Sequence, residues 1–159
     1  MISRWKDFFS IYLFSDMICN WFWIGGVFLV SVQPILGGVT QEQMMSAGKL
    51  MRDVCHPKFS KVSVEQADSI SKGIIPDDKD SKCYINCILE MMQMMKKGKF
   101  LYESSLKQID VLVPDDMVEE YRNGVTACKD AAQGIKNNCE ASYALLVCFR
   151  DKISRFMFP

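Results

Sequence analysis

Seven cysteines stand in this chain, and the spacing of six of them limits how it can fold. Those six leave 27, 3, 40, 10 and 8 residues between consecutive members. An even set of cysteines in a short exported chain is typical of a disulfide framework, because a small core gains from covalent cross-links. The sequence therefore predicts three disulfides among Cys55, Cys83, Cys87, Cys128, Cys139 and Cys148.

The two closest cysteines, Cys83 and Cys87, lie in an apolar segment that we predict to be helical. At this spacing both side chains project from one helix face and reach different neighbours more naturally than each other. We therefore expect two disulfides on this helix, and the spacing by itself leaves the other pairings open. The alternative interpretation of these cysteines is a zinc site, but the sequence has a single histidine, His56, which makes a poor set of zinc ligands. We predict no metal and no cofactor.

The first 39 residues are typical of an export signal. No charged residue lies between Asp16 and Glu42, and an apolar run at 21–32 precedes small residues. We predict a signal peptide at 1–39 and a domain at 40–159. The signal can include an N-terminal extension, because Met17 offers a second start. A membrane anchor is the competing interpretation, which glycines within the span disfavour. Cleavage would also remove Cys19, the seventh cysteine.

Charge is balanced in the predicted domain. The whole chain has 19 basic and 19 acidic residues, and residues 1–39 contain two of each, which leaves 17 and 17. The densest basic cluster is Lys96, Lys97 and Lys99, in a glycine-containing turn. A nucleic-acid binder needs a basic stripe, so we expect no nucleic-acid partner.

Apolar periodicity predicts an all-α fold, without strands of useful length. In the segment 41–54, apolar residues recur on one helical face. Ser63 and Gln66 form a capping-box pattern that begins a helix reaching about residue 71. The segment 80–95 is apolar on most of its circumference, which predicts a central helix. Further helices are expected at 103–111, about 115–133 and 138–152, followed by an apolar tail at 153–159.

Catalytic patterns are weak in this sequence. A hydrolase triad needs a histidine that a carboxylate can orient, and the single histidine, His56, stands directly before Pro57. The chain has no phosphate loop and no dinucleotide fingerprint. We predict that the protein is not an enzyme, and we interpret His56 as a loop or surface residue that could sense pH.

The spacing of the six cysteines resembles that of the insect odorant-binding proteins of the six-cysteine type, the pheromone and general odorant-binding family. The resemblance covers residues 41–159, and the combination of gaps carries it. Short motifs are similar to those of the LUSH-like, alcohol-binding members: Cys55-x-Pro57-Lys58-Phe59, Cys83-Tyr84-x-x-Cys87, Lys96-Lys97-Gly98-x-Phe100, Leu112-Val113-Pro114 and Phe156-Met157-x-Pro159.

This resemblance implies a compact six-helix domain around an apolar cavity, with interlocked disulfides Cys55–Cys87, Cys83–Cys139 and Cys128–Cys148. It also implies a secreted carrier that reversibly binds small hydrophobic volatile ligands, odorants or pheromones. The carrier would work in sensillar lymph and deliver its ligand to an olfactory receptor complex at a neuronal membrane. Two alternatives stay open: a non-olfactory carrier of small hydrophobic molecules, and a secreted helical partner-binding protein without a ligand. A homodimer is also left open.

Methionines and aromatic residues at helical spacing supply the candidate cavity wall. Methionine side chains are flexible and adapt to ligands of different shape. Apolar residues at helical spacing, however, more commonly pack in a solid core than line a cavity. The predicted ligand-binding residues are Met44, Met51, Ile88, Leu89, Met91, Met92, Met94, Met95, Phe100, Leu112, Val113, Tyr121, Leu146 and Phe158.

Three positions depart from the LUSH-like members. Leu89 and Met94 stand where those relatives have small hydroxyl residues in the simplest alignment, and Phe158 stands in place of a terminal tryptophan. An aromatic or mid-sized apolar odorant therefore suits this wall better than a short-chain alcohol. The tail at 153–159 is expected to fold over the cavity as a lid, with a frayed terminus as the alternative.

Overall fold

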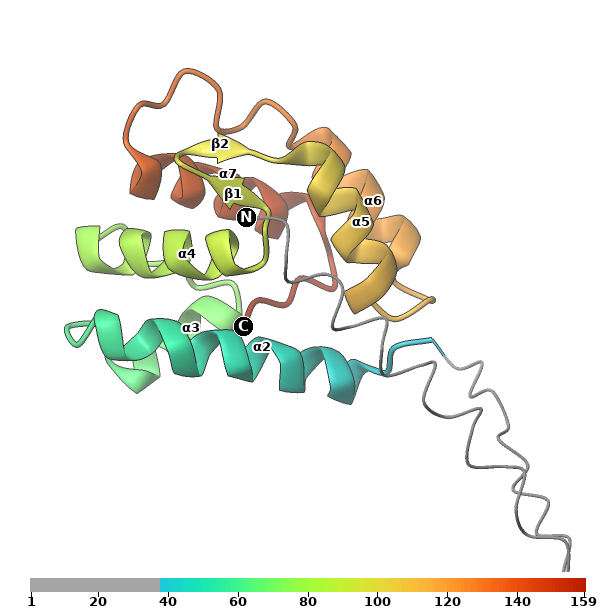
Figure 1. The fold of residues 1–159 in the computed structure, drawn as a ribbon, viewed down its shortest axis with the longest axis horizontal. Coiled ribbons are helices and arrows are strands. Elements are labelled where there is room, and N and C mark those ends of the chain that lie inside the picture. Colours follow the sequence, from blue (N-terminus) through green and yellow to red (C-terminus); the bar gives the residue numbers. More distant parts are fainter. Residues whose placement is uncertain (1–37) are drawn as a thin grey trace, which may run out of the picture. The chain divides into compact units, whose positions relative to one another are not determined.

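The computed structural model describes residues 38–159, so nearly all of the predicted signal peptide, including Cys19, lies outside the described residues. Six α-helices make up most of this part (Figure 1), which confirms the all-α class. They are α2 (Gln41–Cys55), α3 (Val64–Ser71), α4 (Lys79–Met91), α5 (Tyr102–Leu112), α6 (Val118–Ala127) and α7 (Asn138–Lys152). A one-turn 3₁₀ helix, η1 (His56–Lys58), follows α2, and a hairpin of β1 (Met95–Lys96) and β2 (Lys99–Phe100) follows α4.

Side-chain caps fix where four of the helices begin. Thr40 and Ser63 each form a complete capping box, the latter with Gln66 as predicted. Asp78 caps α4. The cap of α7 is Asn137, one residue before the expected start, and its Oδ1 accepts the backbone N–H groups of the first turn at 2.9 and 3.1 Å.

The predicted helix at 80–95 is wrong beyond Met91. Gln93 has a φ of 55°, which interrupts the helix, and the N–H of Met94 turns back to the carbonyl of Leu89 at 2.9 Å. Lys97 and Gly98 then both adopt positive φ, of 51° and 74°, as a tight two-residue hairpin turn requires. The chain thus reverses direction where apolar periodicity alone suggested one more helical turn.

The expected helix at 115–133 is also too long. α6 begins at Val118 and ends at Ala127, and the segment after it forms tight turns. The N–H of Ala131 bonds to the carbonyl of Cys128 at 3.0 Å, three residues back rather than four. Cys128 is tied to α7 by a disulfide, so the chain bends toward that helix there.

Three disulfides join the helices in the pairing that the resemblance implies. Cys55–Cys87 links the end of α2 to α4, Cys83–Cys139 links α4 to the start of α7, and Cys128–Cys148 links the end of α6 to α7. Both bonds of α4 leave from one face, as the four-residue spacing of Cys83 and Cys87 predicts. Disulfides therefore connect α2, α4, α7 and the end of α6 in one covalent series.

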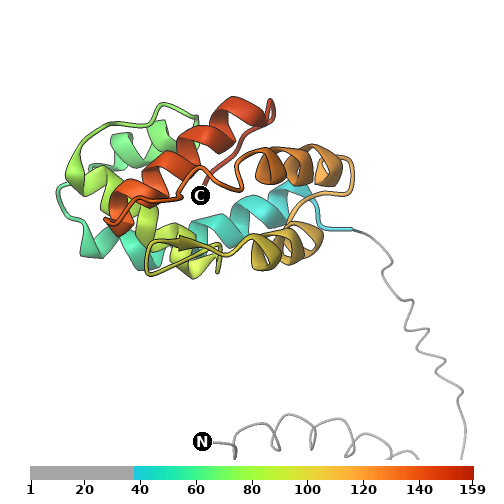
Figure 2. The ribbon, with the colours of Figure 1, turned by 90° about the horizontal axis from the view of Figure 1, so that it is seen from above.

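α4 and α7 form the most extensive helix pair (Figures 1 and 2). Tyr84 and Ile85 of α4 and Leu145 of α7 have no exposed surface. A partly buried hydrogen bond of 2.8 Å joins the Ser142 hydroxyl of α7 to the Asn86 side-chain oxygen of α4. α2 packs on the other side of α4, which gives α4 the central position that its apolar circumference predicted.

Replacing Cys128 and Cys148 together by alanine should lower the free energy of unfolding by about 2–4 kcal/mol, because the closed loop no longer restricts the unfolded chain. Urea unfolding followed by circular dichroism would measure this change. An unfolding midpoint equal to that of the parent protein would contradict a stabilising role for this disulfide.

Candidate functional site

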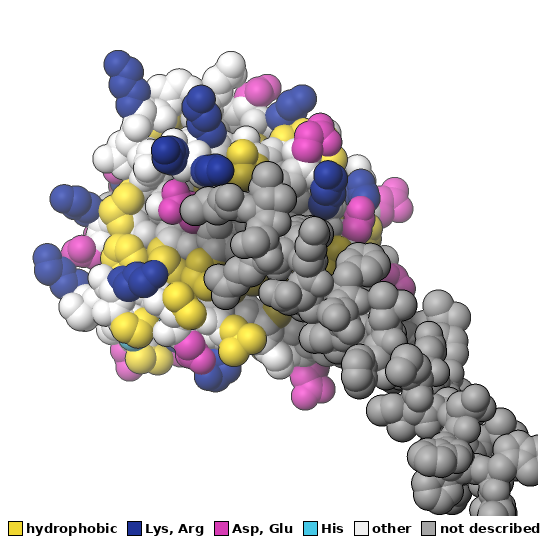
Figure 3. Space-filling model, in the orientation of Figure 1, with side chains coloured by type: hydrophobic (Ala, Val, Ile, Leu, Met, Phe, Trp, Pro, Cys, Tyr) yellow, Lys and Arg dark blue, Asp and Glu magenta, His cyan; other side chains and the backbone are white. Residues whose placement is uncertain are grey.

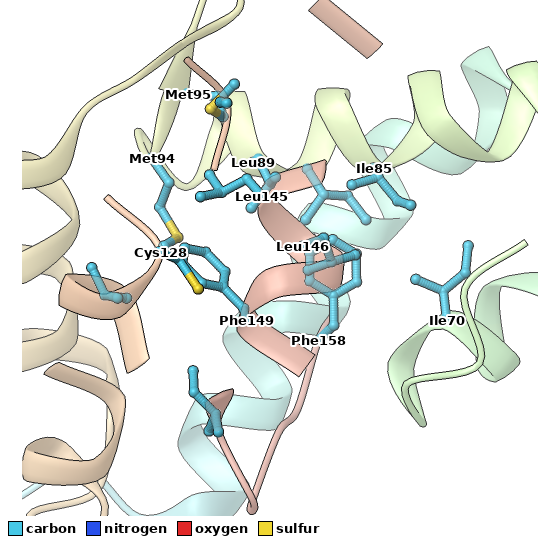
Figure 4. Packing of buried hydrophobic residues seen from close by; sticks show 14 of the residues in the cluster. Ile70, Ile85, Leu89, Met94, Met95, Cys128, Leu145, Leu146, Phe149 and Phe158 are labelled. Atoms are coloured by element: carbon cyan, nitrogen blue, oxygen red, sulfur yellow. The ribbon is translucent and has the colours of Figure 1, made fainter. Parts of the chain in front are cut away.

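A large cavity lies among α2, α4, α5, α6, α7 and the C-terminal tail. Its volume is about 960 Å³, and its inner wall is mostly apolar. Figure 4 shows Leu146 and Phe149 of α7 and Phe158 of the tail pointing into one region with Leu89 and Met94. The lining also includes exposed side chains of α2 such as Glu42, so the cavity reaches the surface along that helix. Concave apolar sites of this kind are typical of small-molecule binding.

Ten of the fourteen predicted ligand-binding residues line this cavity. They are Met44, Met51, Leu89, Met92, Met94, Leu112, Val113, Tyr121, Leu146 and Phe158. They come from five helices, the segments that follow α4 and α5, and the tail, and the fold brings them to one cavity. Their contact with a ligand stays a prediction.

The other four predicted residues, Ile88, Met91, Met95 and Phe100, lie outside the cavity lining. Ile88 and Met95 are buried in the surrounding core. Met91 is 39% exposed, and its sulfur lies 3.5 Å from that of Cys55. Phe100 packs edge-on against Phe149, with ring centroids 5.9 Å apart. The turn after α4 directs Met94 into the cavity and Met95 away from it.

Sequence reasoning missed several residues of the wall. Ile109, Val125 and Phe149 line the cavity from α5, α6 and α7. Their apolar character was a usable signal, but nothing in the sequence separates them from ordinary core residues. His56 also lines the cavity, and its Nε2 is buried. His56 lies in η1, the one-turn connection between α2 and α3, and its side chain as a whole is half-buried.

The C-terminal tail, residues 153–159, forms one side of the cavity. Ile153 and Phe158 are 3% and 7% exposed, so the tail is docked rather than frayed. The hydroxyl of Tyr121 donates to the carbonyl of Arg155 at 2.9 Å and accepts the N–H of Met157 at 3.1 Å. A single α6 side chain thus satisfies two backbone groups of the tail.

The neighbouring residue of α6, Glu120, binds the same stretch of the tail. Its carboxylate accepts the Ser154 hydroxyl at 2.7 Å and the backbone N–H and Nε of Arg155, each at 2.9 Å. Arg155 also forms an ion pair with Asp116 at 2.6 Å. These contacts anchor the tail just before its apolar end enters the cavity.

The anchor has consequences for two pKa values. Hydrogen bonds from Ser154 and Arg155 favour the carboxylate and lower the pKa of Glu120 to about 2. Burial raises the pKa of Tyr121, which keeps its hydroxyl protonated and able to donate. Both groups therefore keep the protonation state that the tail contacts require through the neutral and mildly acidic range.

Two glycines inside helices make room for the tail. A β-carbon at Gly124 of α6 would collide with the Cγ1 atom of Ile153. A β-carbon at Gly48 of α2 would lie 3.3 Å from the Cα atom of Pro159. Glycine inside a helix is intrinsically unfavourable, so its presence is explained by the close approach of the tail.

Comparison with known proteins identifies the family. The PBP/GOBP family matches residues 38–152. General odorant-binding protein 19a of Drosophila melanogaster is 60% identical over 135 residues, which cover 82% of this chain and 92% of that protein. General odorant-binding protein 72 of Anopheles gambiae is 49% identical over 121 residues, which cover 76% and 99%. The chain belongs to the PBP/GOBP family.

Solved structures of odorant-binding proteins have the same fold. Odorant binding protein 4 of Chrysopa pallens superposes with a TM-score of 0.68 at 34% identity, covering 76% of this chain and 99% of that one. Odorant binding protein 5 of Apis mellifera gives 0.69 at 26% identity, covering 77% and 99%. The resemblance inferred from the cysteine spacing is thus confirmed.

A metal site and a membrane-spanning helix each place requirements on the described residues. Across residues 38–159, no three His, Cys, Asp or Glu side chains are grouped so that they could hold a metal ion. Over the same residues, every helix is too short or too polar to cross a bilayer.

Replacing Gly124 by alanine should destabilise the protein by about 1–3 kcal/mol, because the new methyl group displaces Ile153. Helix propensity alone predicts a gain of about 1 kcal/mol from the same change. Urea unfolding would measure the difference. In an Ile153→Ala background the substitution should become neutral or stabilising, and equal destabilisation in both backgrounds would contradict the contact.

The Glu120 anchor should resist mild acid. A glutamate in an unfolded chain has a pKa of about 4.3, and the folded value is about 2, so the stabilisation is complete above the first value and fades as pH falls toward the second. The stability gap between the parent protein and Glu120→Gln should therefore stay constant from about pH 8 to pH 5 and close below about pH 4. Urea midpoints across pH would test this.

Glu119→Gln is the matched control, because the adjacent carboxylate makes no hydrogen bond to the described tail. Its substitution should produce no comparable gap at any pH. A Glu120 gap that already closes between neutral pH and about pH 5 would show that another group governs the docking of the tail.

Proposed function

We propose that this chain is a secreted carrier that reversibly binds small hydrophobic volatile molecules and delivers them to olfactory receptors. Insect odorant-binding proteins are small-ligand carriers, and this chain has their family features and fold. The observation that carries the proposal is the apolar cavity of about 960 Å³, one side of which is the chain's own docked tail. Carriage needs no reaction, so the proposed role is not enzymatic.

Affinity in such a cavity comes mainly from removing apolar ligand surface from water. A ligand that buries about 300 Å² gains about 8 kcal/mol at roughly 25 cal/mol per Å². Before the cost of association, that corresponds to about micromolar binding. Met44, Met51, Met92 and Met94 give the wall flexible side chains that can adjust to ligands of different shape. This lining favours a mid-sized apolar or aromatic ligand.

The surface supports a carrier that moves through an aqueous fluid. Figure 3 shows basic and acidic side chains interspersed on the face that it presents, with apolar side chains between them. On this visible face of the described residues, the basic side chains do not form the continuous stripe that nucleic-acid binding requires. Non-olfactory carriage would use the same cavity, so tissue of expression decides between the two. Delivery to a receptor complex remains a prediction.

The tail is proposed to act as the lid of the carrier. Its apolar end lines the cavity, while its polar start is held on α6 by Glu120 and Tyr121. Movement of residues 156–159 would open that side and break the bond from the Met157 N–H to the Tyr121 hydroxyl, while the contacts of Ser154 and Arg155 with α6 stay in place. Ligand exchange would then cost only the contacts of the last few residues.

Replacing Met94 by tryptophan should weaken binding of the fluorescent probe N-phenyl-1-naphthylamine by about tenfold or more, because the larger ring fills space that the ligand needs. Fluorescence titration of the secreted, oxidised protein would measure the dissociation constant. Met91→Trp is the matched control, since Met91 is partly exposed and lies outside the cavity lining. Equal effects of the two substitutions, or no probe binding by the parent protein, would contradict the proposed function.

A further inference from the structure

We propose that the hairpin after α4 and the segment between α6 and α7 form a binding surface for a sulfated glycan, an extracellular polyanion. Five lysines make up this lysine surface: Lys96, Lys97, Lys99, Lys129 and Lys136. None of them lines the cavity, so the lysine surface is separate from it. The inference shares with the proposed function only the secretion of the protein, because sulfated glycans lie outside cells.

The hairpin places two of these lysines directly opposite each other. Lys96 of β1 pairs with Lys99 of β2 in the antiparallel register. Successive side chains of a strand point to opposite faces, so both lysines share the outward face, while Met95 is buried on the inner one. Opposed residues in a hairpin have β-carbons about 4.5–5.5 Å apart, and two like charges at such a pair destabilise it.

No counter-charge in the described part of the chain relieves this repulsion. Among residues 38–159, none of the five lysines forms an ion pair with an aspartate or a glutamate. By contrast, Lys82 of α4 is held by the carboxylates of Asp77 and Glu140. All five lysines of the lysine surface are exposed. Their charge is therefore available to an external anion.

The turn of the hairpin adds a third lysine at an unfavourable backbone position. Lys97 has a φ of 51°, in the left-handed region where asparagine and glycine are the usual turn residues. Its backbone N–H bonds to the Glu90 carboxylate at 3.2 Å, which holds the turn on α4. Three lysines within such a short segment are typical of patches that bind heparin or nucleic acid.

The segment between α6 and α7 lies beside the hairpin (Figures 1 and 2). A β-carbon at Gly98 would lie 3.4 Å from the Cα atom of Asn138, two residues after Lys136. The ammonium of Lys129 lies over the Tyr102 ring, 4.8 Å from its centroid, just beyond β2. Figure 3 shows several basic side chains over this part of the molecule. The two additional lysines therefore extend the charge of the hairpin.

Nearby acidic residues are too few to cancel this charge. Segments 94–101 and 128–138 contain the five lysines and a single acidic residue, Asp130. The carboxylate of Glu90 also lies at the turn, where it accepts a backbone N–H. Five positive charges thus face two negative ones, and the excess favours an anionic partner.

Nucleic acid is the competing polyanion for such a surface. Proteins that bind single strands add aromatic rings on which the bases stack. The two rings beside the lysines, Phe100 and Tyr102, are half-buried and meet edge-on, with centroids 6.3 Å apart. Neither therefore offers an open face to a base, and a chain that carries sulfates fits the lysine surface better.

The test is isothermal titration of the secreted, oxidised protein with a heparin dodecasaccharide at several NaCl concentrations. The parent protein should bind it, and the logarithm of the association constant should fall linearly with that of the salt concentration, because counterions are released. Replacing Lys96, Lys97 and Lys99 together by glutamine should weaken binding by about tenfold or more and reduce the salt slope by about one for each lost contact. Desulfated heparin should bind about tenfold more weakly than heparin, because it carries fewer charges.

The matched control replaces Lys58, Lys72 and Lys152 together by glutamine. It removes the same net charge from exposed lysines outside the lysine surface, so the affinity for heparin should change by less than about twofold. Lys99→Glu turns the like-charge pair into an opposite-charge pair, so it should raise the urea midpoint and abolish heparin binding. A lower midpoint would contradict the like-charge repulsion on which the proposal rests.

Equal weakening by the two triple substitutions would overturn the proposal and assign binding to net charge alone. Binding of a single-stranded DNA of about 12 nucleotides as tightly as heparin would also overturn it and indicate a nucleic-acid surface. A parent protein that does not bind heparin at about 0.15 M salt would refute the lysine surface itself. These results leave the carrier function intact, because N-phenyl-1-naphthylamine should bind the parent protein and both triple variants equally well.

Discussion

The α4–α7 pair is the constraint on which the rest of this structure depends. Both helices contribute fully buried side chains, such as Ile85 of α4 and Leu145 of α7, and the Cys83–Cys139 bond fixes the two helices at one end. Cys55–Cys87 then attaches α2 to α4, and Cys128–Cys148 attaches the end of α6 to α7. Because cross-links hold the surrounding helices in place, the space between them need not be filled by side chains to be stable. A domain of this size can thus keep a cavity that an unlinked core would tend to close.

The cavity is completed by the chain's own last residues. Ile153 and Pro159 approach α6 and α2 at Gly124 and Gly48, where a larger side chain would hold them away. Polar contacts from Glu120 and Tyr121 fix the start of the tail, while its apolar end packs into the wall. The start of the tail therefore anchors it to α6, and the apolar end covers the cavity. Such a division allows the end to move while its attachment is preserved.

Much of this organisation was predictable because it depends on local chemistry or on spacing. The four-residue interval between Cys83 and Cys87 placed two disulfides on one helix face, and the capping box at Ser63 fixed the start of α3. The gaps between the six cysteines were enough to indicate the family. Most of the residues chosen by apolar spacing border the cavity, because the apolar face of a helix is the face turned to the interior of the domain.

By itself, then, the sequence determined the helical class, the cross-linked framework and the apolar character of the interior. Tertiary structure alone decided which apolar residues border the cavity and which are packed solid, because Met94 and Met95 differ only in how the turn after α4 directs them. It also decided that His56, typical of a loop in sequence, lies in the wall with a buried unpaired nitrogen. The spacing of apolar residues indicates which face of a helix is buried. Whether that side meets protein or empty space depends on segments far apart in the chain.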